Sequence, residues 1–199
     1  RERLSYEPSE AQRRARLIST DARRLDLPDR FDLVMAACGF IEYFHEAGGV
    51  EEVLQTALRH LDKDGVLLMD GGVPDLDHMR KVDGIPREYV FTHPISGSDI
   101  LYLVTSRYDF AEQIQEDEVR LLERADGTVL RTEHFFEKRR YRFPSQIRAM
   151  LSGAGFEIIH EQGALTEEIP VSENGGEMVF LCSRNVYPEN AGKGPLLKN

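Results

Sequence analysis

The sequence predicts an α/β fold built on a mostly parallel sheet, and two strand-like runs with a helix between them carry this prediction. Residues 31–37 and 66–70 are short and almost continuously apolar, as is typical of strands that are covered on both faces. Residues 50–61 repeat apolar side chains at the spacing of one buried helix face. Strand, helix and strand with short connections form a βαβ unit, whose crossover is almost always right-handed. We therefore expect helices on both faces of this sheet.

A second pattern interrupts the alternation of strands and helices midway along the chain. Three segments, 100–108, 113–123 and 128–140, are rich in β-branched, aromatic and charged residues. Asp126-Gly127 separates the last two segments and is a strong hairpin signal. The sequence thus predicts an inserted element of three antiparallel strands.

The part of the chain after this insertion returns to the α/β pattern. Pro144 stands at a favoured first position of a helix, and Gly155 ends that helix. Strands are expected over residues 156–160 and 178–182, and residues 185–199, rich in Pro, Gly and Lys, are expected to form a flexible tail.

The segments with weaker signals are the N-terminal residues and the region before the insertion. A short helix is expected from Ser9, and residues 17–20 are expected to form a short strand that ends at Asp21. Residues 73–99 hold several prolines and glycines, which favour loops with one short helix.

Composition narrows the classes of function. The chain has 199 residues and a formal net charge of -10, so it repels phosphate backbones and nucleic acid is a poor candidate partner. No apolar run approaches the roughly 20 residues that span a bilayer, which argues against a membrane protein. Cys38 and Cys182 lie in apolar runs without metal-ligand spacing. We expect two buried thiols, no metal site and a cytoplasmic protein.

Four motifs follow one another in an order that is typical of a known family. The strand ending at Asp21 comes first, and "FDLV" at 31–34 follows it. A helix, a glycine and the strand 66–70 come next, and Ala154-Gly155-Phe156 before a strand comes last. This order resembles class I S-adenosylmethionine-dependent methyltransferases, and the insertion resembles that of small-molecule N- and O-methyltransferases. The resemblance covers residues 1–184, as one domain with its insertion at about residues 100–141.

The resemblance implies a Rossmann-like sheet with an antiparallel last strand, and an insertion that covers the substrate pocket. One motif of the family does not occur: the sequence contains no G-x-G-x-G, the glycine-rich turn that approaches the cofactor. Two strands of the family's sheet would belong between residues 17–20 and the "FDLV" strand. We therefore expect the chain to be a fragment, with a missing N-terminal segment or a second copy covering the edge of the "FDLV" strand.

The resemblance also implies where S-adenosylmethionine would bind. Asp21 would accept a hydrogen bond from the adenine amino group and Ala22 would offer its backbone N–H, although Asp21 could instead cap the following turn. Ala37, Cys38 and Gly39 follow the "FDLV" strand, at the strand end where ligands of open α/β sheets bind. Their small size would let the backbone approach the sulfonium, or would only serve a tight loop.

The residues that would bind the substrate carry the weakest signal. Tyr43, Arg107 and Tyr108 are candidates, since aromatic and cationic side chains can position a small acceptor. Arg139 is a further cation that could hold a substrate carboxylate. Methyl transfer is an in-line displacement that depends mainly on positioning, and it needs a base only when the acceptor starts protonated. No single histidine stands out as that base, so the catalytic residue is unknown.

The sequence leaves two functions open. The first is methyl transfer from S-adenosylmethionine to a small-molecule N or O acceptor. The second is a non-catalytic methyltransferase-like scaffold or partner subunit that has lost the cofactor loop. A nucleic-acid methyltransferase is a third reading, which the net charge disfavours.

Overall fold

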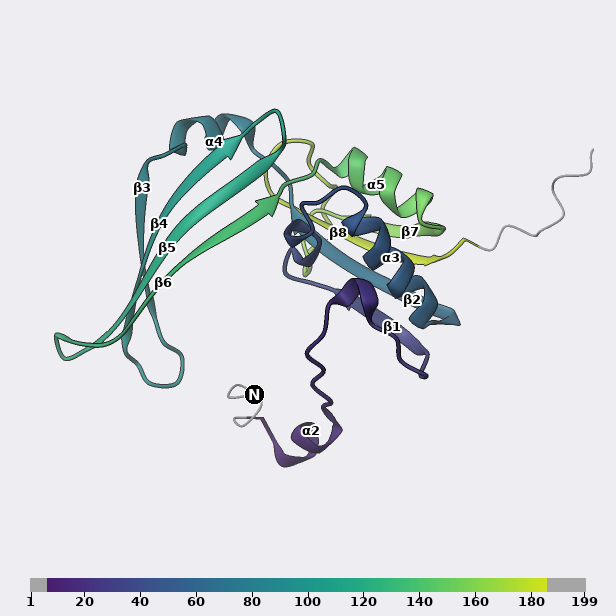
Figure 1. Cartoon of the computed structure of the whole chain (residues 1–199), viewed down its shortest axis with the longest axis horizontal. Coiled ribbons are helices and arrows are strands. Elements are labelled where there is room, and N and C mark those ends of the chain that lie inside the picture. The colour runs from purple at the N-terminus through teal and green to yellow at the C-terminus, as the bar shows by residue number, and fades with distance from the viewer. Residues whose placement is uncertain (1–6, 186–199) are drawn as a thin grey trace, which may run out of the picture.

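The computed structural model describes residues 7–185, which form two four-stranded sheets joined at one end (Figure 1). The first sheet contains β1 (Phe31–Ala36), β2 (Leu61–Gly72), β7 (Phe156–Gln162) and β8 (Glu177–Arg184). The second sheet contains β3 (Pro86–Thr92), β4 (Asp99–Asp109), β5 (Ile114–Ala125) and β6 (Thr128–Arg140). The helices are α2 (Ser9–Arg14), α3 (Gly49–His60), α4 (Leu76–Val82) and α5 (Pro144–Gly153), with the short 3₁₀ helices η1 (Ala22–Arg24) and η2 (Phe40–Tyr43). No described helix is long and apolar enough to cross a membrane.

The first sheet has the order β1-β2-β8-β7 and places the strands predicted near residues 34, 66, 158 and 180 in one sheet, as expected. β1 pairs parallel with β2, whereas β8 pairs antiparallel with both β2 and β7. Three of the four strands therefore point the same way, and the last strand of the chain runs against them. Met69 on β2 faces Phe180 on β8, and both are fully buried.

The two helices that pack on this sheet, α3 and α5, lie on one of its faces, whereas the sequence predicted helices on both faces. α3 and α5 contact each other, and Figure 1 shows both of them in front of the sheet. Their apolar side chains, such as Leu54 and Leu151, form one core with Leu67 and Phe180 of the strands. On the opposite face of β1, Leu33 is 48% exposed and Met35 is 58% exposed. The described residues contain no helix that covers this second face.

β1 is an edge strand. Its one neighbour in the described part of the chain is β2, so its other edge leaves backbone N–H and C=O groups unpaired. The short strand expected at residues 17–20 is not formed, and Leu17 and Ile18 are both exposed. A strand needs a neighbour to satisfy its backbone, and among the described residues none lies beside this segment. α2, in contrast, forms as expected.

The second sheet is an antiparallel meander in the order β3-β4-β5-β6. β5 and β6 pair across Asp126-Gly127, where both residues have a positive φ, as the hairpin prediction requires. The insertion has four strands rather than three, because residues 86–92 also form a strand. The sequence signal failed there because Pro86 suggested a loop, but proline is tolerated as the first residue of an edge strand. α4 is the one short helix expected before it.

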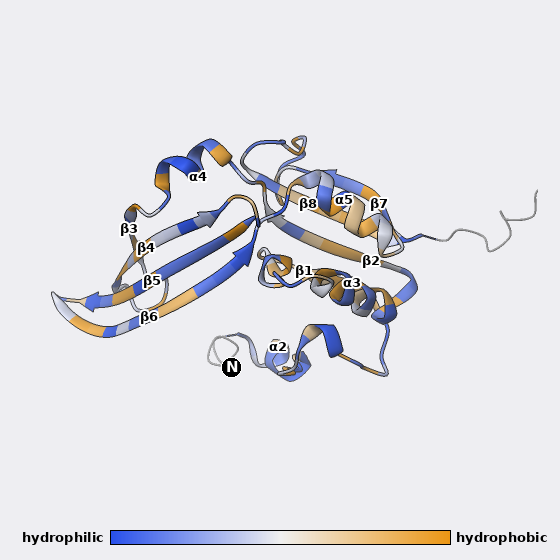
Figure 2. Cartoon of the chain, turned by 45° about the horizontal axis from the view of Figure 1, so that its top comes forward, coloured by the Kyte–Doolittle hydropathy of each residue, from blue (hydrophilic) through white to orange (hydrophobic). Residues whose placement is uncertain are grey.

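The other C-terminal predictions hold within the described residues. α5 begins at Pro144, and Gly155 follows it with a φ of 92°. Figure 2 shows a continuous hydrophobic stretch in the middle of β2, whereas β5 is mostly hydrophilic with separate apolar positions, in keeping with a buried and a half-exposed sheet. The tail predicted at 185–199 lies outside the described residues except for Asn185.

Arg142 joins the two sheets. Its guanidinium is buried and donates to the carbonyl oxygens of Ile41 at 3.1 Å and Phe44 at 2.7 Å. Burial lowers the pKa of Arg142, because the charged form loses its hydration. Since Arg142 follows β6 directly and both carbonyls belong to η2 or its end, this contact sets how η2 lies against the second sheet.

Candidate functional site

A cleft of about 490 Å³ lies where the two sheets meet. We call it the junction cleft. It is lined from the first sheet by the loop after β1 and the segment after β2, and from the second sheet by Gln115 and Arg139. Tyr141, just after β6, completes this wall. The carboxyl ends of the parallel strands β1 and β2 thus open into the cleft, where ligands of open α/β sheets bind.

The loop after β1 is shaped by two left-handed residues. Cys38 has a φ of 62° and Gly39 a φ of 64°. The backbone N–H of Gly39 donates to the Asp70 carboxylate at the end of β2, at 2.8 Å. Cys38 and Gly39 line the junction cleft and Ala37 lies beside them, so the structure brings the three predicted residues to the strand ends. Cys38 is exposed, which corrects the expected buried thiol, because the left-handed turn directs it away from the core.

Cys182 is the buried thiol of the pair. It lies on β8 with no exposed surface, and burial raises its pKa to about 12 because a thiolate would lose its hydration. Such a thiol is chemically inert and serves as a small apolar side chain.

Glu42, on η2, is the most unusual acid of the junction cleft. Its side chain is 18% exposed, and its Oε1 accepts the backbone N–H of Gly72 at 3.2 Å. Its carboxylate lies directly over Gly39, where an added Cβ would come within 3.0 Å of Oε1. Burial raises the pKa of Glu42 above its usual range, although Gly72 and Arg139 act in the opposite direction.

Arg139 and Asp117 form the charged wall opposite Glu42. Nη2 of Arg139 lies 2.6 Å from Oδ2 of Asp117, whose side chain is 2% exposed, and Nη1 lies 3.7 Å from Oε2 of Glu42. Burial alone would raise the pKa of Asp117, but hydrogen bonds from Ser106, Gln115 and Arg139 hold it below its usual range. Arg139 is therefore held by Asp117 rather than free to grip a substrate.

Tyr141 contributes a hydroxyl without a protein partner. The residue is 7% exposed, and its hydroxyl oxygen is buried and makes no hydrogen bond to the described residues. Its pKa is raised, chiefly by burial and also by the negative charge of Asp109. A buried hydroxyl without a partner is costly, so a ligand or water that supplied one would be held there.

Asp21 and Ala22 lie on the other side of β1. The Asp21 carboxylate accepts the backbone N–H of Arg23 and is paired with its guanidinium, which lowers the pKa of Asp21 to about 2. The turn-cap alternative is thus realised, and both carboxylate oxygens also accept hydrogen bonds from the Arg23 guanidinium, although 34% of the Asp21 side chain is exposed. Ala22 lines an apolar groove of about 370 Å³ together with Ala36 and Phe40.

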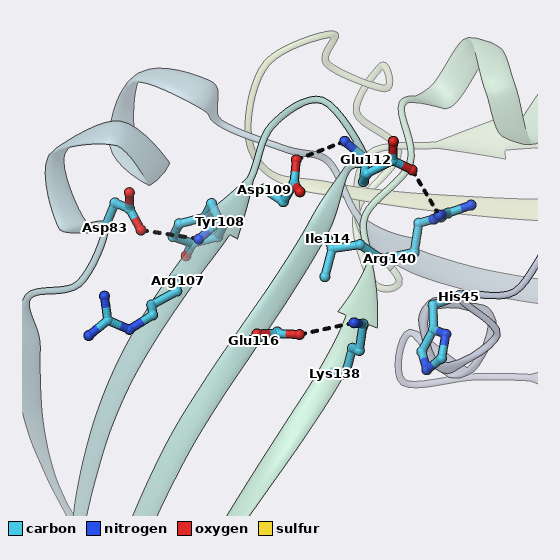
Figure 3. Close-up of a pocket in the computed structure, with 10 residues that line it drawn as sticks. All are labelled: His45, Asp83, Arg107, Tyr108, Asp109, Glu112, Ile114, Glu116, Lys138 and Arg140. Carbon is cyan, nitrogen blue, oxygen red and sulfur yellow. Dashed lines mark hydrogen bonds and ion pairs between the residues drawn. The ribbon is translucent and has the colours of Figure 1, made fainter.

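Arg107 and Tyr108 line a second cavity, of about 590 Å³, in the second sheet rather than the junction cleft (Figure 3). Lys138 pairs there with Glu116 across β5 and β6 at 3.0 Å. The backbone N–H of Tyr108 donates to Asp83. Figure 3 shows the guanidinium of Arg107 pointing away from the Lys138–Glu116 pair.

Tyr43 sits on η2 beside Glu42 and is 49% exposed. Its pKa is raised by burial and by the charge of Glu137, whereas Arg139 lowers it. Tyr43 therefore belongs to the charged network at the junction of the sheets, although it does not line the cleft itself.

Sequence reasoning missed Glu42, Asp117 and Tyr141. Glu42 reads as the polar face of a short helix, and Asp117 reads as a solvated charge along a hairpin. The one local signal for Glu42 was its position three residues after Gly39 at the end of a buried strand. Among residues 7–185 no cluster of His, Cys, Asp and Glu is suited to hold a metal ion.

No family model matches the sequence, and no curated protein has a significantly similar sequence. Solved structures, in contrast, are clearly similar in fold. An S-adenosylmethionine-dependent methyltransferase from Clostridium acetobutylicum superimposes with a TM-score of 0.70 at 12% identity, over 85% of this chain and 64% of that chain. The chain has the class I methyltransferase fold.

Two further methyltransferases support this fold. CcbJ from Streptomyces caelestis has a TM-score of 0.68 at 17% identity, over 92% of this chain and 68% of its own. CalS10 from Micromonospora echinaspora, an amino pentose methyltransferase solved with S-adenosylmethionine bound, has a TM-score of 0.59 at 19% identity, over 83% of this chain and 63% of its own. The chain thus spans about two thirds of the length of these methyltransferases.

Proposed function

We propose that the complete protein transfers a methyl group from S-adenosylmethionine to a nitrogen or oxygen atom of a small molecule. The observation that carries this proposal is the junction cleft, which lies at the carboxyl ends of β1 and β2 in a chain with the methyltransferase fold. The antiparallel sheet forms the opposite wall of this cleft, where it can bind and enclose a small acceptor. The similar structures include methyltransferases of small molecules, such as CalS10.

The residues present fit one side of the cofactor. The apolar groove beside Ala22, Ala36 and Phe40 suits a flat adenine ring, and Asp21, next to Ala22 in the chain, would share a carboxylate oxygen between Arg23 and the adenine amino group. The left-handed turn at Cys38 and Gly39 leaves backbone open toward the cleft, where the reacting end of the cofactor would lie. When bound, S-adenosylmethionine supplies an electrophilic methyl group.

The chain's own residues position the acceptor and exclude water. Glu42 and the Asp117–Arg139 pair fix the polarity of the cleft, and Tyr141 offers an unused hydroxyl. An in-line displacement depends mainly on holding the acceptor about 3 Å from the methyl carbon, so rigid walls of this kind contribute much of the rate. Tyr43, Arg107 and Tyr108 remain proposed contacts for larger acceptors.

The non-catalytic alternative makes the opposite prediction for ligand binding. We expect the complete protein to bind S-adenosylhomocysteine, the product of every such transfer, with a dissociation constant in the micromolar range or lower. Isothermal titration calorimetry with purified protein measures this directly. Absence of binding for both S-adenosylhomocysteine and S-adenosylmethionine would reject the proposed function and support a scaffold role.

A further inference from the structure

We propose that Glu42 is the residue that binds and deprotonates the acceptor, and that the acceptor is an amine which arrives as an ammonium ion. This inference rests on the proposed function and deepens it, since it selects nitrogen over oxygen. It starts from the surroundings of one carboxylate in the junction cleft.

The Glu42 carboxylate has unused capacity to accept hydrogen bonds. A carboxylate has about four lone-pair sites. Glu42 uses one of them for the backbone N–H of Gly72, and its other oxygen lies 3.7 Å from Arg139, which is beyond hydrogen-bond distance. A largely buried carboxylate with one hydrogen bond is poorly compensated for its lost hydration. A cation with N–H donors would supply what is missing.

Three glycines leave space for the Glu42 carboxylate at the ends of the strands. An added Cβ would lie 3.0 Å from Glu42 Oε1 at Gly39, 3.6 Å at Gly71 and 3.9 Å at Gly72. These glycines come from the ends of β1 and β2, which meet only in the folded sheet. Because they have no side chains, the Glu42 carboxylate can lie against the strand ends, and it borders the cleft on the side where the transferred methyl would arrive.

The positive charge of Arg139 does not neutralise Glu42. Arg139 is bound to Asp117 at 2.6 Å, and Asp117 lies almost entirely buried behind it. Asp70, whose charge also acts on Glu42, accepts the N–H of Gly39 at the end of β2. Three carboxylates at the junction, those of Glu42, Asp70 and Asp117, thus stand against two guanidiniums, Arg139 and the carbonyl-bound Arg142, so a cationic ligand is favoured over an anionic one.

The acid–base chemistry distinguishes an amine from an alcohol. An aliphatic ammonium has a pKa of about 10, as in lysine. An alcohol resembles water, whose pKa is about 16. Burial raises the pKa of Glu42 toward that of an ammonium ion, so the carboxylate becomes a better proton acceptor for an ammonium. It remains far too weak a base to deprotonate an alcohol.

The step balances as follows. The ammonium nitrogen gives one proton to a Glu42 oxygen and recovers its lone pair. That lone pair forms the new N–C bond while the C–S bond breaks and its electron pair remains on sulfur. The methylated product leaves as an ammonium ion, and the protonated Glu42 returns its proton to water.

Ligand binding tests this inference without an identified acceptor. Sinefungin is an analogue of S-adenosylmethionine in which an amino group on carbon replaces the sulfonium methyl, so it places an ammonium near the acceptor position. S-adenosylhomocysteine lacks that group. We expect the complete protein to bind sinefungin at least about tenfold more tightly than S-adenosylhomocysteine, and Glu42→Gln to reduce this ratio to about one.

The matched control is Glu52→Gln, which removes an exposed acid on α3 and should leave the ratio unchanged. The affinity for S-adenosylhomocysteine should agree within about twofold among all variants.

If Glu42→Gln does not fold, Glu42→Asp keeps the charge but withdraws it by one methylene, and an intermediate ratio is expected. The inference is overturned if the ratio is unchanged in Glu42→Gln or Glu42→Asp, or if the parent protein does not prefer sinefungin. In either case, binding of S-adenosylhomocysteine by the parent protein still supports the proposed function. Loss of all binding in the parent protein overturns both.

Discussion

Asp117 and Arg139 lie diagonally across strands β5 and β6, and Nη2 of Arg139 is 2.6 Å from Oδ2 of Asp117. The acid is almost fully buried, while 29% of the Arg139 side chain is exposed toward the junction cleft. The pair therefore anchors a cation at the wall of the cleft. Removal of the acid would leave that cation partly buried without its partner.

We expect Asp117→Asn to lower the free energy of unfolding by about 2–4 kcal/mol, because the amide keeps the shape but not the charge. Urea unfolding measures this change. Glu116→Gln, which removes an exposed acid on the same strand, is the control and should have little effect. Equal effects of the two substitutions would show that the buried pair has no special role.

The junction of the two sheets is expected to depend on Arg142. Arg142→Met keeps most of the apolar stem but leaves the carbonyl oxygens of Ile41 and Phe44 without their donor. A loss of about 2–4 kcal/mol in unfolding free energy is expected. Arg13→Met on the exposed helix α2 is the control and should change it by less than about 0.5 kcal/mol. Thermal and urea unfolding of both variants decide the matter.

Glu42 is expected to destabilise the ligand-free protein at neutral pH. Its pKa is raised in the folded state by burial, so the fold favours the protonated form. Protonated Glu42 contributes fully to stability at a pH below its pKa in the unfolded protein. This contribution is lost as the pH rises through its pKa in the folded protein. Glu42→Gln should therefore be more stable than the parent protein at pH 7, and the difference should vanish near pH 4. A variant that is less stable at pH 7 would contradict this sign.

The proposed contact of Asp21 with adenine can be separated from its role as a turn cap. Asp21→Ala removes both roles, whereas Arg23→Ala removes the ion pair but keeps the carboxylate. If Asp21 contacts adenine, Asp21→Ala weakens S-adenosylhomocysteine binding by about tenfold and Arg23→Ala by much less. Calorimetry on the complete protein measures both. Equal losses would assign the effect to the Asp21–Arg23 ion pair and not to a contact with adenine.

The exposed edge and face of β1 predict self-association of residues 1–199 expressed alone. Met35→Lys places a charge on this exposed apolar strand and should increase the monomeric fraction in size-exclusion chromatography. Ile159→Lys on β7, the opposite edge of the same sheet, is the control. In the complete protein, Met35→Lys should lower the melting temperature if another segment or a second copy covers β1. A monomer in the parent chain would contradict this prediction.

The sequence by itself determined the elements whose signals are local. The apolar runs of β1 and β2, the periodicity of α3, the Asp126-Gly127 turn and Pro144 of α5 each act within a few residues, so their patterns predicted the structure correctly. β3 was missed because Pro86 at its start, among several prolines and glycines, indicated a loop. The strand at residues 17–20 was wrong because a strand exists only beside a partner.

The tertiary structure alone decided the candidate site. Glu42 lies over Gly71 and Gly72, about 30 residues further along the chain, and Arg139 meets it from the end of β6, almost 100 residues away. No pattern in the sequence predicts these contacts, because burial and charge pairing depend on segments that are distant in the chain. From the sequence, a glutamate on a four-residue 3₁₀ helix is expected to be solvated. In the folded protein the two sheets bury Glu42, and this burial raises its pKa.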